Sequence, residues 1–272
     1  MSDISRLVII GGSGQIGRSL NFGINTNRSL IDVSDQQSVF NELRRLNASA
    51  VLNLASVGIV PSQQDPEYAL KINVDGAYNV AQAARKLNIP MIIVTTGAVF
   101  NGQYGTTFNE EAIPEPQCIY GKTKHMAELI VRAEAPDHLI IRTGWLFALN
   151  IAPQKKFVEL SIAAAKKNHR FKATIDQSGS PTYMPDFLST FKTAIIEDRR
   201  KILHIANKGT ASPYNIAEFI YNYYGLNNMI DPVSFTTFSN GVPRSKAEGL
   251  CSSTLNLRPW TDALTEYLKN DR

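Results

Sequence analysis

The sequence predicts an α/β fold of the Rossmann type, in which helices cover both faces of a doubly wound parallel sheet. Two observations in the first half of the chain lead to this expectation. Short runs of apolar, β-branched residues alternate there with amphipathic stretches, and this alternation is typical of a parallel sheet buried between helices. In addition, the glycine-rich segment Gly11–Gly17 directly follows the first apolar run.

Composition narrows the class of protein further. The chain has 272 residues, of which 43% are hydrophobic and 19% charged, and these values exclude disordered and coiled-coil proteins. The net charge of +4 comes from scattered basic residues, so we expect no nucleic-acid partner. Two cysteines and four isolated histidines indicate neither a disulfide framework nor a metal site. We expect a cytoplasmic protein, because no apolar run approaches the roughly 18 residues of a membrane span and no secretory signal is evident.

Each predicted strand of the first half is a short apolar run, and each predicted helix is an amphipathic stretch between two such runs. A strand buried on both faces needs apolar residues at successive positions, whereas a surface helix repeats its apolar positions every three to four residues. The predicted strands are Leu7–Ile10, Val51–Leu54, Met91–Thr95 and Leu139–Arg142. The predicted helices are Gln36–Asn47, Asp65–Asn88 and Tyr120–Ala135.

The second half is less regular. Helical spacing continues in four stretches, and a short strand-like run follows the first of them. The polar, glycine-bearing segment Ser239–Ser253 predicts a loop. We therefore expect one domain over residues 1–150 and a smaller lobe over residues 151–272, with some exchange of elements between the two. The predicted helices are Lys155–Asn168, Asp186–Glu197, Pro213–Tyr224 and Pro259–Lys269, and the predicted strand is Phe171–Ile175.

The segment Gly11–Gly17 has the spacing G-x-x-G-x-x-G and opens a predicted helix. Glycine allows positive φ in a tight turn and lets the backbone approach a pyrophosphate closely. The helix N-terminus then offers unpaired N–H groups to phosphate oxygens. A purely structural glycine turn has the same letters, but the position directly after the first strand favours a nucleotide-binding loop. Residues 1–150 are therefore the expected NAD(P)-binding domain.

The unit after the glycine loop is short, and it bears on the choice of cofactor. Only 14 residues separate Gly17 from Asp32, so the helix and strand between them must be trimmed. Arg28 lies near the expected end of that strand, where an arginine could pair with the 2′-phosphate of NADP and an acid would select NAD. We expect NADP(H) to be favoured and NAD(H) to be possible. In the alternative interpretations, Arg28 is a solvated surface residue and Asp32 caps the helix that begins near Ser34.

A tyrosine and a lysine, Tyr120 and Lys124, are four residues apart in a predicted helix and share one of its faces. A free phenol has a pKa of about 10, and a neighbouring ammonium favours the phenolate and lowers that pKa. Such a tyrosine can donate a proton to a carbonyl that is being reduced. A hydroxyl is also needed to orient the carbonyl oxygen, and Thr95 and Thr96 end a predicted strand at the edge where open α/β sheets bind ligands.

With these motifs the chain resembles the extended short-chain dehydrogenase/reductases and, among them, the dTDP-4-dehydrorhamnose reductase family. The resemblance covers nearly the whole chain. Tyr120–Lys124 (YGKTK) is similar to the family's Y-G-x-S-K, and Thr95–Gly102 (TTGAVFNG) resembles S-T-D-Y-V-F-D-G, which places the catalytic hydroxyl on Thr96. The more specific motifs lie later, where Arg142–Trp145 (RTGW) resembles R-T-S-W and Asp176–Thr182 (DQSGSPT) matches D-Q-x-G-x-P-T.

The resemblance implies a reductase that transfers hydride from NAD(P)H to the C4 ketone of a nucleotide-linked deoxysugar, as in dTDP-rhamnose and polysaccharide biosynthesis. Thr96, Tyr120 and Lys124 are then the catalytic residues, with Tyr120 as the proton donor, and the nucleotide-sugar is expected between the sheet and the second lobe. The implied cofactor-binding residues are Gly11, Ser13, Gly14, Gln15, Ile16, Gly17, Arg28, Asp32, Val33, Leu54, Ala55, Ser56, Asn73, Thr95, Tyr120 and Lys124. The implied substrate-binding residues are Val57, Gly97, Ala98, Val99, Trp145, Gln177, Pro181, Thr182 and Arg244.

Two departures from the family pattern leave the substrate and the assembly open. Gly97-Ala98 replaces an Asp-Tyr pair that contacts the sugar in the family, so the substrate could be a different 4-keto sugar or the product the other C4 epimer. Gly58–Gln64 replaces the acidic segment T-A-V-D-x-A-E, so we expect a monomer or a homodimer without the metal-linked contact built on those acids. Trp145 could also be a core residue, and Arg244 an exposed loop cation.

An alternative from another class is a non-catalytic, nucleotide-binding regulatory subunit. The beta subunit of methionine adenosyltransferase resembles the same family and serves a partner enzyme. The altered sugar pocket favours this alternative, whereas the retention of Thr96, Tyr120 and Lys124 favours catalysis, because a binding module has no need of all three.

Overall fold

The apolar runs of the first half form neighbouring strands of one six-stranded sheet, in the order β11-β6-β4-β3-β1-β2. β1 pairs in parallel with β2 and β3, and β3 pairs in parallel with β4. Every residue of β1 and β3 is buried, as expected for apolar runs covered on both faces. The strands are β1 (Leu7–Ile10), β2 (Ile24–Asn25), β3 (Ala50–Asn53), β4 (Met91–Thr96), β6 (His138–Thr143) and β11 (Ile202–Ile205).

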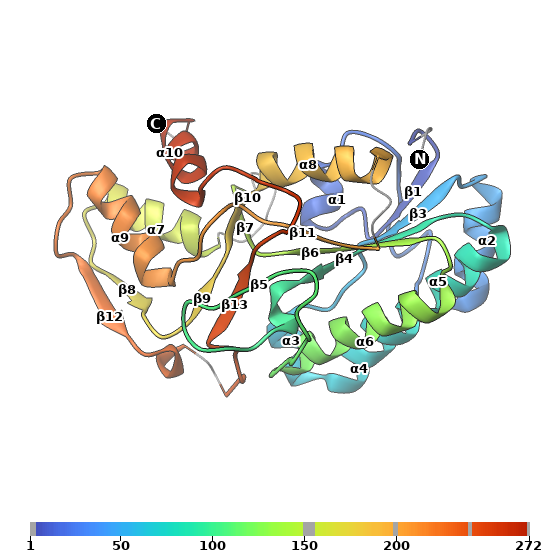
Figure 1. The fold of residues 1–272 in the computed structure, drawn as a ribbon, viewed down its shortest axis with the longest axis horizontal. Helices are drawn as coiled ribbons and strands as arrows, with labels where there is room; N and C mark the ends of the chain where they lie inside the picture. Colours follow the sequence, from blue (N-terminus) through green and yellow to red (C-terminus); the bar gives the residue numbers. More distant parts are fainter. Residues whose placement is uncertain (1–3, 149–155, 198–200, 239–240, 271–272) are drawn as a thin grey trace. The chain divides into compact units, whose positions relative to one another are not determined.

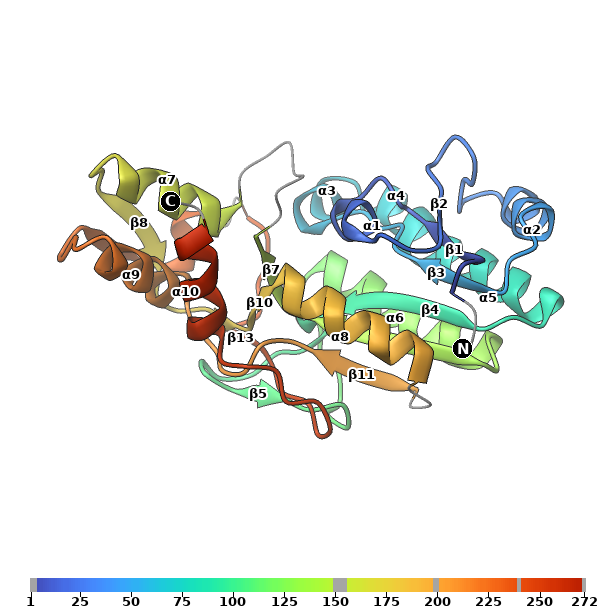
Figure 2. The same ribbon diagram turned by 90° about the horizontal axis from the view of Figure 1, so that it is seen from above.

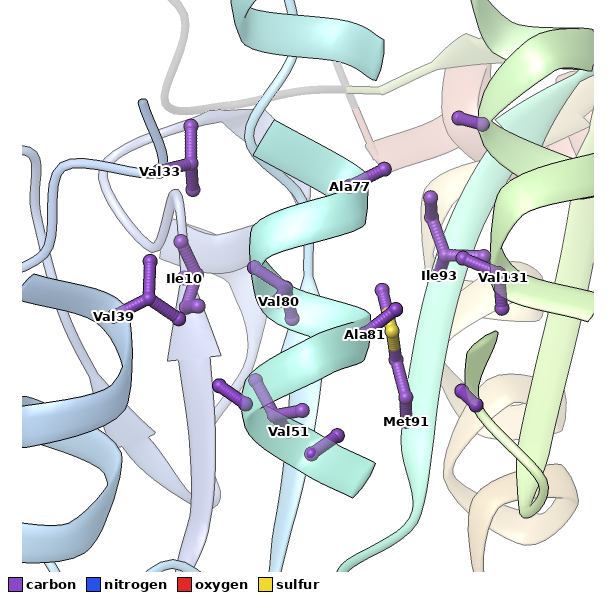
Figure 3. Packing of buried hydrophobic residues seen from close by; sticks show 14 of the residues in the cluster. Ile10, Val33, Val39, Val51, Ala77, Val80, Ala81, Met91, Ile93 and Val131 are labelled. Carbon is purple, nitrogen blue, oxygen red and sulfur yellow. The ribbon is translucent and has the colours of Figure 1, made fainter. Parts of the chain in front are cut away.

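Helices cover both faces of this sheet, which confirms the predicted Rossmann-type α/β class. Figure 3 shows α5 between β1 and β4, with Val80 and Ala81 against Ile10 and Met91 in one apolar cluster. Figure 1 shows α1 and α8 on the opposite face from α5 and α6, and Figure 2 views the sheet from the α8 side. The helices are α1 (Gln15–Ser19), α2 (Gln36–Arg45), α5 (Gly76–Leu87), α6 (Ile119–Glu134) and α8 (Met184–Glu197).

Between β3 and β4 the chain is helical over almost the whole span predicted for Asp65–Asn88, and a π-helical turn lies inside it. The span forms α4 (Pro66–Leu70), the π-helical turn η1 (Lys71–Asp75) and α5, and α3 (Ile59–Gln64) precedes them. Asp65 explains the break before α4, because its side chain caps that helix by accepting a hydrogen bond from the Tyr68 amide. The predicted trimming of the unit after the glycine loop is confirmed, since α1 has five residues and β2 has two.

The computed structural model describes residues 4–148, 156–197, 201–238 and 241–270. The chain divides into two units, whose boundaries differ from the predicted division at residue 150. Each unit draws on three separate stretches of chain, because strands distant in sequence pair within it. Among the described helices, none has both the length and the apolar character needed to cross a bilayer. The first unit is Met1–Val99, Pro116–Arg142 and Leu188–Leu203, and the second is Phe100–Glu115, Thr143–Phe187 and His204–Arg272.

The second unit combines three small sheets with α7, α9 and α10 around an aromatic core that includes Phe147, Tyr183 and Tyr221. The predicted loop Ser239–Ser253 contains a strand, β13, which pairs in parallel with β5 and β9. Residues 239–240 of that loop, and Lys155 of the predicted helix Lys155–Asn168, lie outside the described residues. The strands are β5 (Thr107–Phe108), β7 (Trp145–Phe147), β8 (Phe171–Thr174), β9 (Ser178–Gly179), β10 (Pro181–Tyr183), β12 (Ile230–Val233) and β13 (Ala247–Leu250). The helices are α7 (Phe157–Lys166), α9 (Pro213–Tyr223) and α10 (Trp260–Asn270), and short 3-10 turns are η2 (Gly97–Val99) in the first unit and η3 (Phe235–Thr237) in the second.

Candidate active site

The glycine loop after β1 lies tightly against the chain that follows β3. Gly11 has a φ of +76°, and a Cβ at this position would lie 2.7 Å from the amide nitrogen of Ala55. A Cβ on Gly17 would lie 2.5 Å from the Cα of Gly12. Both positions therefore require glycine, and the two loops meet at the carboxyl ends of adjacent parallel strands.

The amides of this loop suit a pyrophosphate group. The Gly14 amide is bound to the Gly11 carbonyl at 2.9 Å, which closes the turn. Gln15 and Ile16 begin α1, so by position their N–H groups have no intrahelical acceptor and can donate to phosphate oxygens. Because α1 has only five residues, these local donors matter more than the dipole of the helix. Ser13 is exposed beside them.

Arg28 lies beyond the end of β2 in a small exposed network. Its Nε donates to Asp32 Oδ2 at 3.3 Å, and its Nη1 donates to the phenol oxygen of Tyr68 at 2.8 Å. Asp32 also accepts hydrogen bonds from the amide and hydroxyl of Ser34, and these bonds, with the smaller effect of Arg28, lower its pKa. The cap of α2 is Asp35 and not Asp32, because the Asp35 side chain accepts from the first-turn amides.

Several predicted ligands have side chains that serve the fold. Asn73 is buried in η1, where its Oδ1 accepts from the Val57 amide at 2.7 Å and its Nδ2 donates to the Val57 carbonyl and to Thr123 Oγ1. This clamp also occupies both backbone polar groups of Val57, whose side chain lies in the core with that of Val33. In contrast, Leu54 and Ala55 are half-buried and Ser56 is exposed.

The three predicted catalytic residues all belong to the first unit. Thr96 ends β4, and its Oγ1 accepts a hydrogen bond from the Ala98 amide at 3.1 Å, which leaves the hydroxyl proton available. Tyr120 and Lys124 lie one helical turn apart on α6. A Cβ at Gly121 would lie 2.2 Å from the Ala98 carbonyl oxygen, so the first turn of α6 rests directly on η2, the turn that follows Thr96. Glycine at 121 therefore allows this close approach.

A buried ionic network lies one turn further along α6. Glu128 accepts hydrogen bonds from Thr95 Oγ1 at 2.6 Å, Arg142 Nε at 3.0 Å and Arg142 Nη2 at 2.7 Å. Burial raises the pKa of Glu128, but the contacts with His125, Arg142 and Thr95 outweigh it and lower the pKa to about 2. Burial lowers the pKa of Lys124 to about 8, against the opposing effect of the Glu128 carboxylate. The Thr95 hydroxyl is thus committed to Glu128 rather than to a cofactor.

The candidate substrate residues of the second unit lie on paired strands and their connections. Trp145 in β7 pairs with Pro181 in β10 and is half-buried. Thr182 is fully buried, and its hydroxyl donates to the Ser180 carbonyl at 3.1 Å, so it offers no polar group to a ligand. Gln177 is buried next to β9.

Sequence reasoning missed Glu248, which gives no signal in a segment predicted to be a loop. Glu248 is buried in β13, and its Oε2 accepts a hydrogen bond from Trp145 Nε1 at 3.1 Å. Burial raises the pKa of Glu248, while the Trp145 bond and the Arg244 charge act in the opposite direction. Arg244 is half-buried, and its Nε has no hydrogen-bond partner among the described residues. A Cβ at Gly179 would lie 2.3 Å from the Trp145 ring, which fixes the place of the indole.

Comparison with known proteins identifies the family. A family model described as the RmlD substrate binding domain matches residues 5–272. The chain belongs to the dTDP-4-dehydrorhamnose reductase family. Spore coat polysaccharide biosynthesis protein SpsK of Bacillus subtilis is 28% identical over 280 residues, with 98% of each chain covered. A dTDP-4-dehydrorhamnose reductase of Mycobacterium tuberculosis is 28% identical over 284 residues, with 97% of this chain and 92% of that protein covered.

Solved structures of dTDP-4-dehydrorhamnose reductases share the fold. The Yersinia enterocolitica reductase has a TM-score of 0.89 at 26% identity, with 97% of this chain and 98% of that chain covered. The Bacillus anthracis reductase, solved in complex with NADP, has a TM-score of 0.88 at 24% identity, with 99% and 100% covered. The expected family is therefore confirmed along the whole chain.

This member of the dTDP-4-dehydrorhamnose reductase family differs after the threonine that ends β4. Gly97 and Ala98 stand in place of the Asp-Tyr pair of the family pattern, and both are buried in η2 together with Val99. Their side chains carry no polar group, and the Ala98 carbonyl faces the first turn of α6. Any polar recognition of the sugar at this point must therefore come from other residues.

Proposed function

We propose that the chain reduces the C4 ketone of a nucleotide-linked deoxysugar, with NADPH as the preferred source of hydride. Membership of the dTDP-4-dehydrorhamnose reductase family supports this reaction class. The observation that carries the proposal within the structure is the close seating of α6 on η2 at Gly121. It supports the proposal because Tyr120 and Lys124 lie within one turn of Gly121 on α6, and Thr96 directly precedes η2.

In this reaction each of the three residues has one task. The bound nicotinamide supplies the hydride for the ketone carbon. Thr96 donates a hydrogen bond from its hydroxyl to the ketone oxygen and so orients it. Tyr120 gives its phenolic proton to that oxygen as negative charge develops there. The Lys124 ammonium stabilises the phenolate that remains, which makes proton transfer feasible near neutral pH.

The glycine loop and Arg28 are the proposed cofactor ligands with the clearest physical basis. The amides of Gln15 and Ile16 would hold the pyrophosphate, and the Arg28 guanidinium would pair with the 2′-phosphate of NADPH. The NADP in the related Bacillus anthracis reductase supports this preference. Val33 and Asn73 would affect cofactor binding only indirectly. The Val33 side chain is buried in the hydrophobic core, and the Asn73 side chain is hydrogen-bonded to Thr123.

On the substrate side we propose Trp145, Gln177, Pro181 and Arg244 as contacts of the nucleotide-sugar. The Arg244 guanidinium suits a diphosphate, and its Nε still lacks an acceptor among the described residues. Thr182 and Val57 are weaker candidates because their polar groups are already bonded. The segment Gly58–Gln64 has no acidic residue, so we propose a monomer or a homodimer without a metal-linked contact there.

The test is turnover of a panel of 4-keto nucleotide-sugars with NADPH and NADH, followed at 340 nm, with NMR of the product. Replacing the phenol in Tyr120→Phe removes the proton donor, so we expect at least about a 100-fold loss of kcat with NADPH affinity retained. Tyr78→Phe is the matched control, because Tyr78 is an exposed tyrosine on α5 and should leave kcat unchanged.

Two outcomes would contradict the proposal. Unchanged turnover in Tyr120→Phe would remove this residue from the mechanism. NADPH binding without turnover of any sugar in the panel would favour the regulatory-subunit alternative.

A further inference from the structure

The Glu128 carboxylate is buried in the first unit beside the lysine of the proposed site. Glu128 is 2% exposed, and its donors come from Thr95 on β4 and Arg142 on β6. The network thus joins α6 to the neighbouring strands β4 and β6. A buried carboxylate is costly unless donors compensate it, and here three hydrogen bonds of 2.6–3.0 Å do so.

Lys124 lies one helical turn before Glu128 and is 3% exposed. Burial disfavours the charged form of an amine, and among the described residues the Glu128 carboxylate is the charge that opposes this effect at Lys124. The proposed reaction, however, needs an ammonium at this position. The same helix face therefore holds a residue that must stay charged and a buried group of opposite charge.

One more ionisable group faces the Glu128 carboxylate, because His125 Nδ1 on α6 lies 3.7 Å from Glu128 Oε2. Tyr120, at the start of the same helix, is the proposed proton donor. The packed elements α3, β4 and η2 have no ionisable side chain, and Glu67, Lys71 and Asp75 of α4 and η1 are exposed. On α5, Arg85 pairs with Glu134 at the far end of α6.

We propose that Glu128 is a positioning residue of the reductase site, whose buried carboxylate, one helical turn away, keeps Lys124 charged while Thr95 and Arg142 hold that carboxylate. The proposal rests on the proposed function for the task of Lys124. It adds a residue that acts through Lys124 and touches neither cofactor nor substrate. It also explains why the Thr95 hydroxyl faces α6 while the neighbouring Thr96 is left for the ketone.

The direct test is the titration of Lys124 by NMR of the full chain labelled with 13C at the lysine Cε, without cofactor or substrate. Lys124→Met identifies the Lys124 signal. The wild-type midpoint should lie near the pKa of about 8. In Glu128→Gln the stabilising charge is lost, so we expect the midpoint to fall by about one pH unit or more.

Two further variants separate the effect of the Glu128 charge from a general disturbance of the fold. Glu128→Asp keeps the carboxylate and should hold the midpoint near the wild-type value. Glu134→Gln removes a carboxylate from the far end of the same helix and should leave it unchanged. If Glu128→Gln does not fold because Arg142 is left buried without its partner, Glu128→Gln combined with Arg142→Met removes both charges, and the midpoint should still fall.

Kinetics provide the second readout. At pH 8, Glu128→Gln should lose about fivefold or more in kcat, because fewer molecules carry a protonated Lys124, and the deficit should shrink at pH 6.5, where most of Lys124 is protonated in both proteins. A Lys124 midpoint equal to that of the wild type, or a kcat deficit that is independent of pH, would overturn the proposal. Since the titration needs no substrate, a shifted midpoint in a protein that reduces no sugar would count against the proposed function alone.

Discussion

Arg28 is the residue on which, in our proposal, the choice between the two nicotinamide cofactors depends. Its side chain is 64% exposed, and Asp32 and Tyr68 hold its guanidinium beyond the end of β2 through Nε and Nη1. In Arg28→Ala we expect KM for NADPH to rise about tenfold or more and KM for NADH to change less than about twofold. A lost charge-assisted pair of this kind has such a magnitude.

The control for this prediction is Arg44→Ala, which removes the same charge from an exposed position on α2. It should leave the ratio of the two KM values unchanged. Equal effects of Arg28→Ala on NADPH and NADH would show that Arg28 is a solvated surface residue with no part in recognising the 2′-phosphate.

For single residues, the sequence predicted the positions of the motifs but not the hydrogen-bond partner of each side chain. The pattern indicated hydroxyls at both Thr95 and Thr96, yet only the packing of α6 decides that Thr95 binds Glu128. Asn73 followed the family pattern, and its clamp on Val57 depends on the π-helical turn, which no local pattern predicts. Glu248 could not be found, since its partner Trp145 lies 103 positions away.

At the scale of elements, the contact of α6 with η2 determines the geometry of the proposed site. In Gly121→Ala the new Cβ would lie 2.2 Å from the Ala98 carbonyl oxygen, so α6 must move away from η2. Overpacking of this kind costs about 1–3 kcal/mol, which outweighs the gain of about 1 kcal/mol in helix propensity. We expect lower stability in urea and a loss of at least about tenfold in kcat, because Tyr120 moves with the helix.

Lys122→Ala on the same turn is the control, because Lys122 is exposed and an alanine there creates no steric clash. It should preserve both kcat and the urea midpoint. Wild-type kcat in Gly121→Ala would mean that the seating of α6 on η2 does not set the position of Tyr120.

Elements with strong apolar runs were predicted almost to the residue, and weaker ones were not. β1 occupies Leu7–Ile10, as predicted, because four buried positions in a row leave little choice. β13 has its residues 247–250 buried as well, but their letters, AEGL, have low strand propensity. It forms a strand because β5 and β9 offer it hydrogen-bond partners from distant parts of the chain, and no local pattern contains that information.

At the scale of the whole molecule, each unit is assembled from three stretches of chain, and the junctions need their own contacts. Pattern reasoning predicted two regions and some exchange between them, but not which stretches are exchanged. In the second unit Glu110 joins the first stretch to the third. Its carboxylate accepts from the amide of His204, from the hydroxyl of Ser252 and from the amide and hydroxyl of Ser253.

This junction predicts a specific loss of stability in acid. Burial raises the pKa of Glu110, but hydrogen bonds from Ser252, Ser253 and His204 lower it to about 2, below its ordinary value of 4.5. A carboxyl with a depressed pKa in the folded state stabilises the protein above about pH 4.5, and that contribution disappears as the pH falls towards 2. In Glu110→Gln we therefore expect the free energy of unfolding in urea to be lower by about 1–2 kcal/mol at pH 7, a value reduced for partial solvent exposure, and to match the wild type near pH 2. Glu111→Gln, at the exposed neighbouring position, is the control and should have the stability of the wild type at every pH. If the loss of unfolding free energy in Glu110→Gln were as large at pH 2 as at pH 7, the junction would depend on the shape of the side chain and not on its charge.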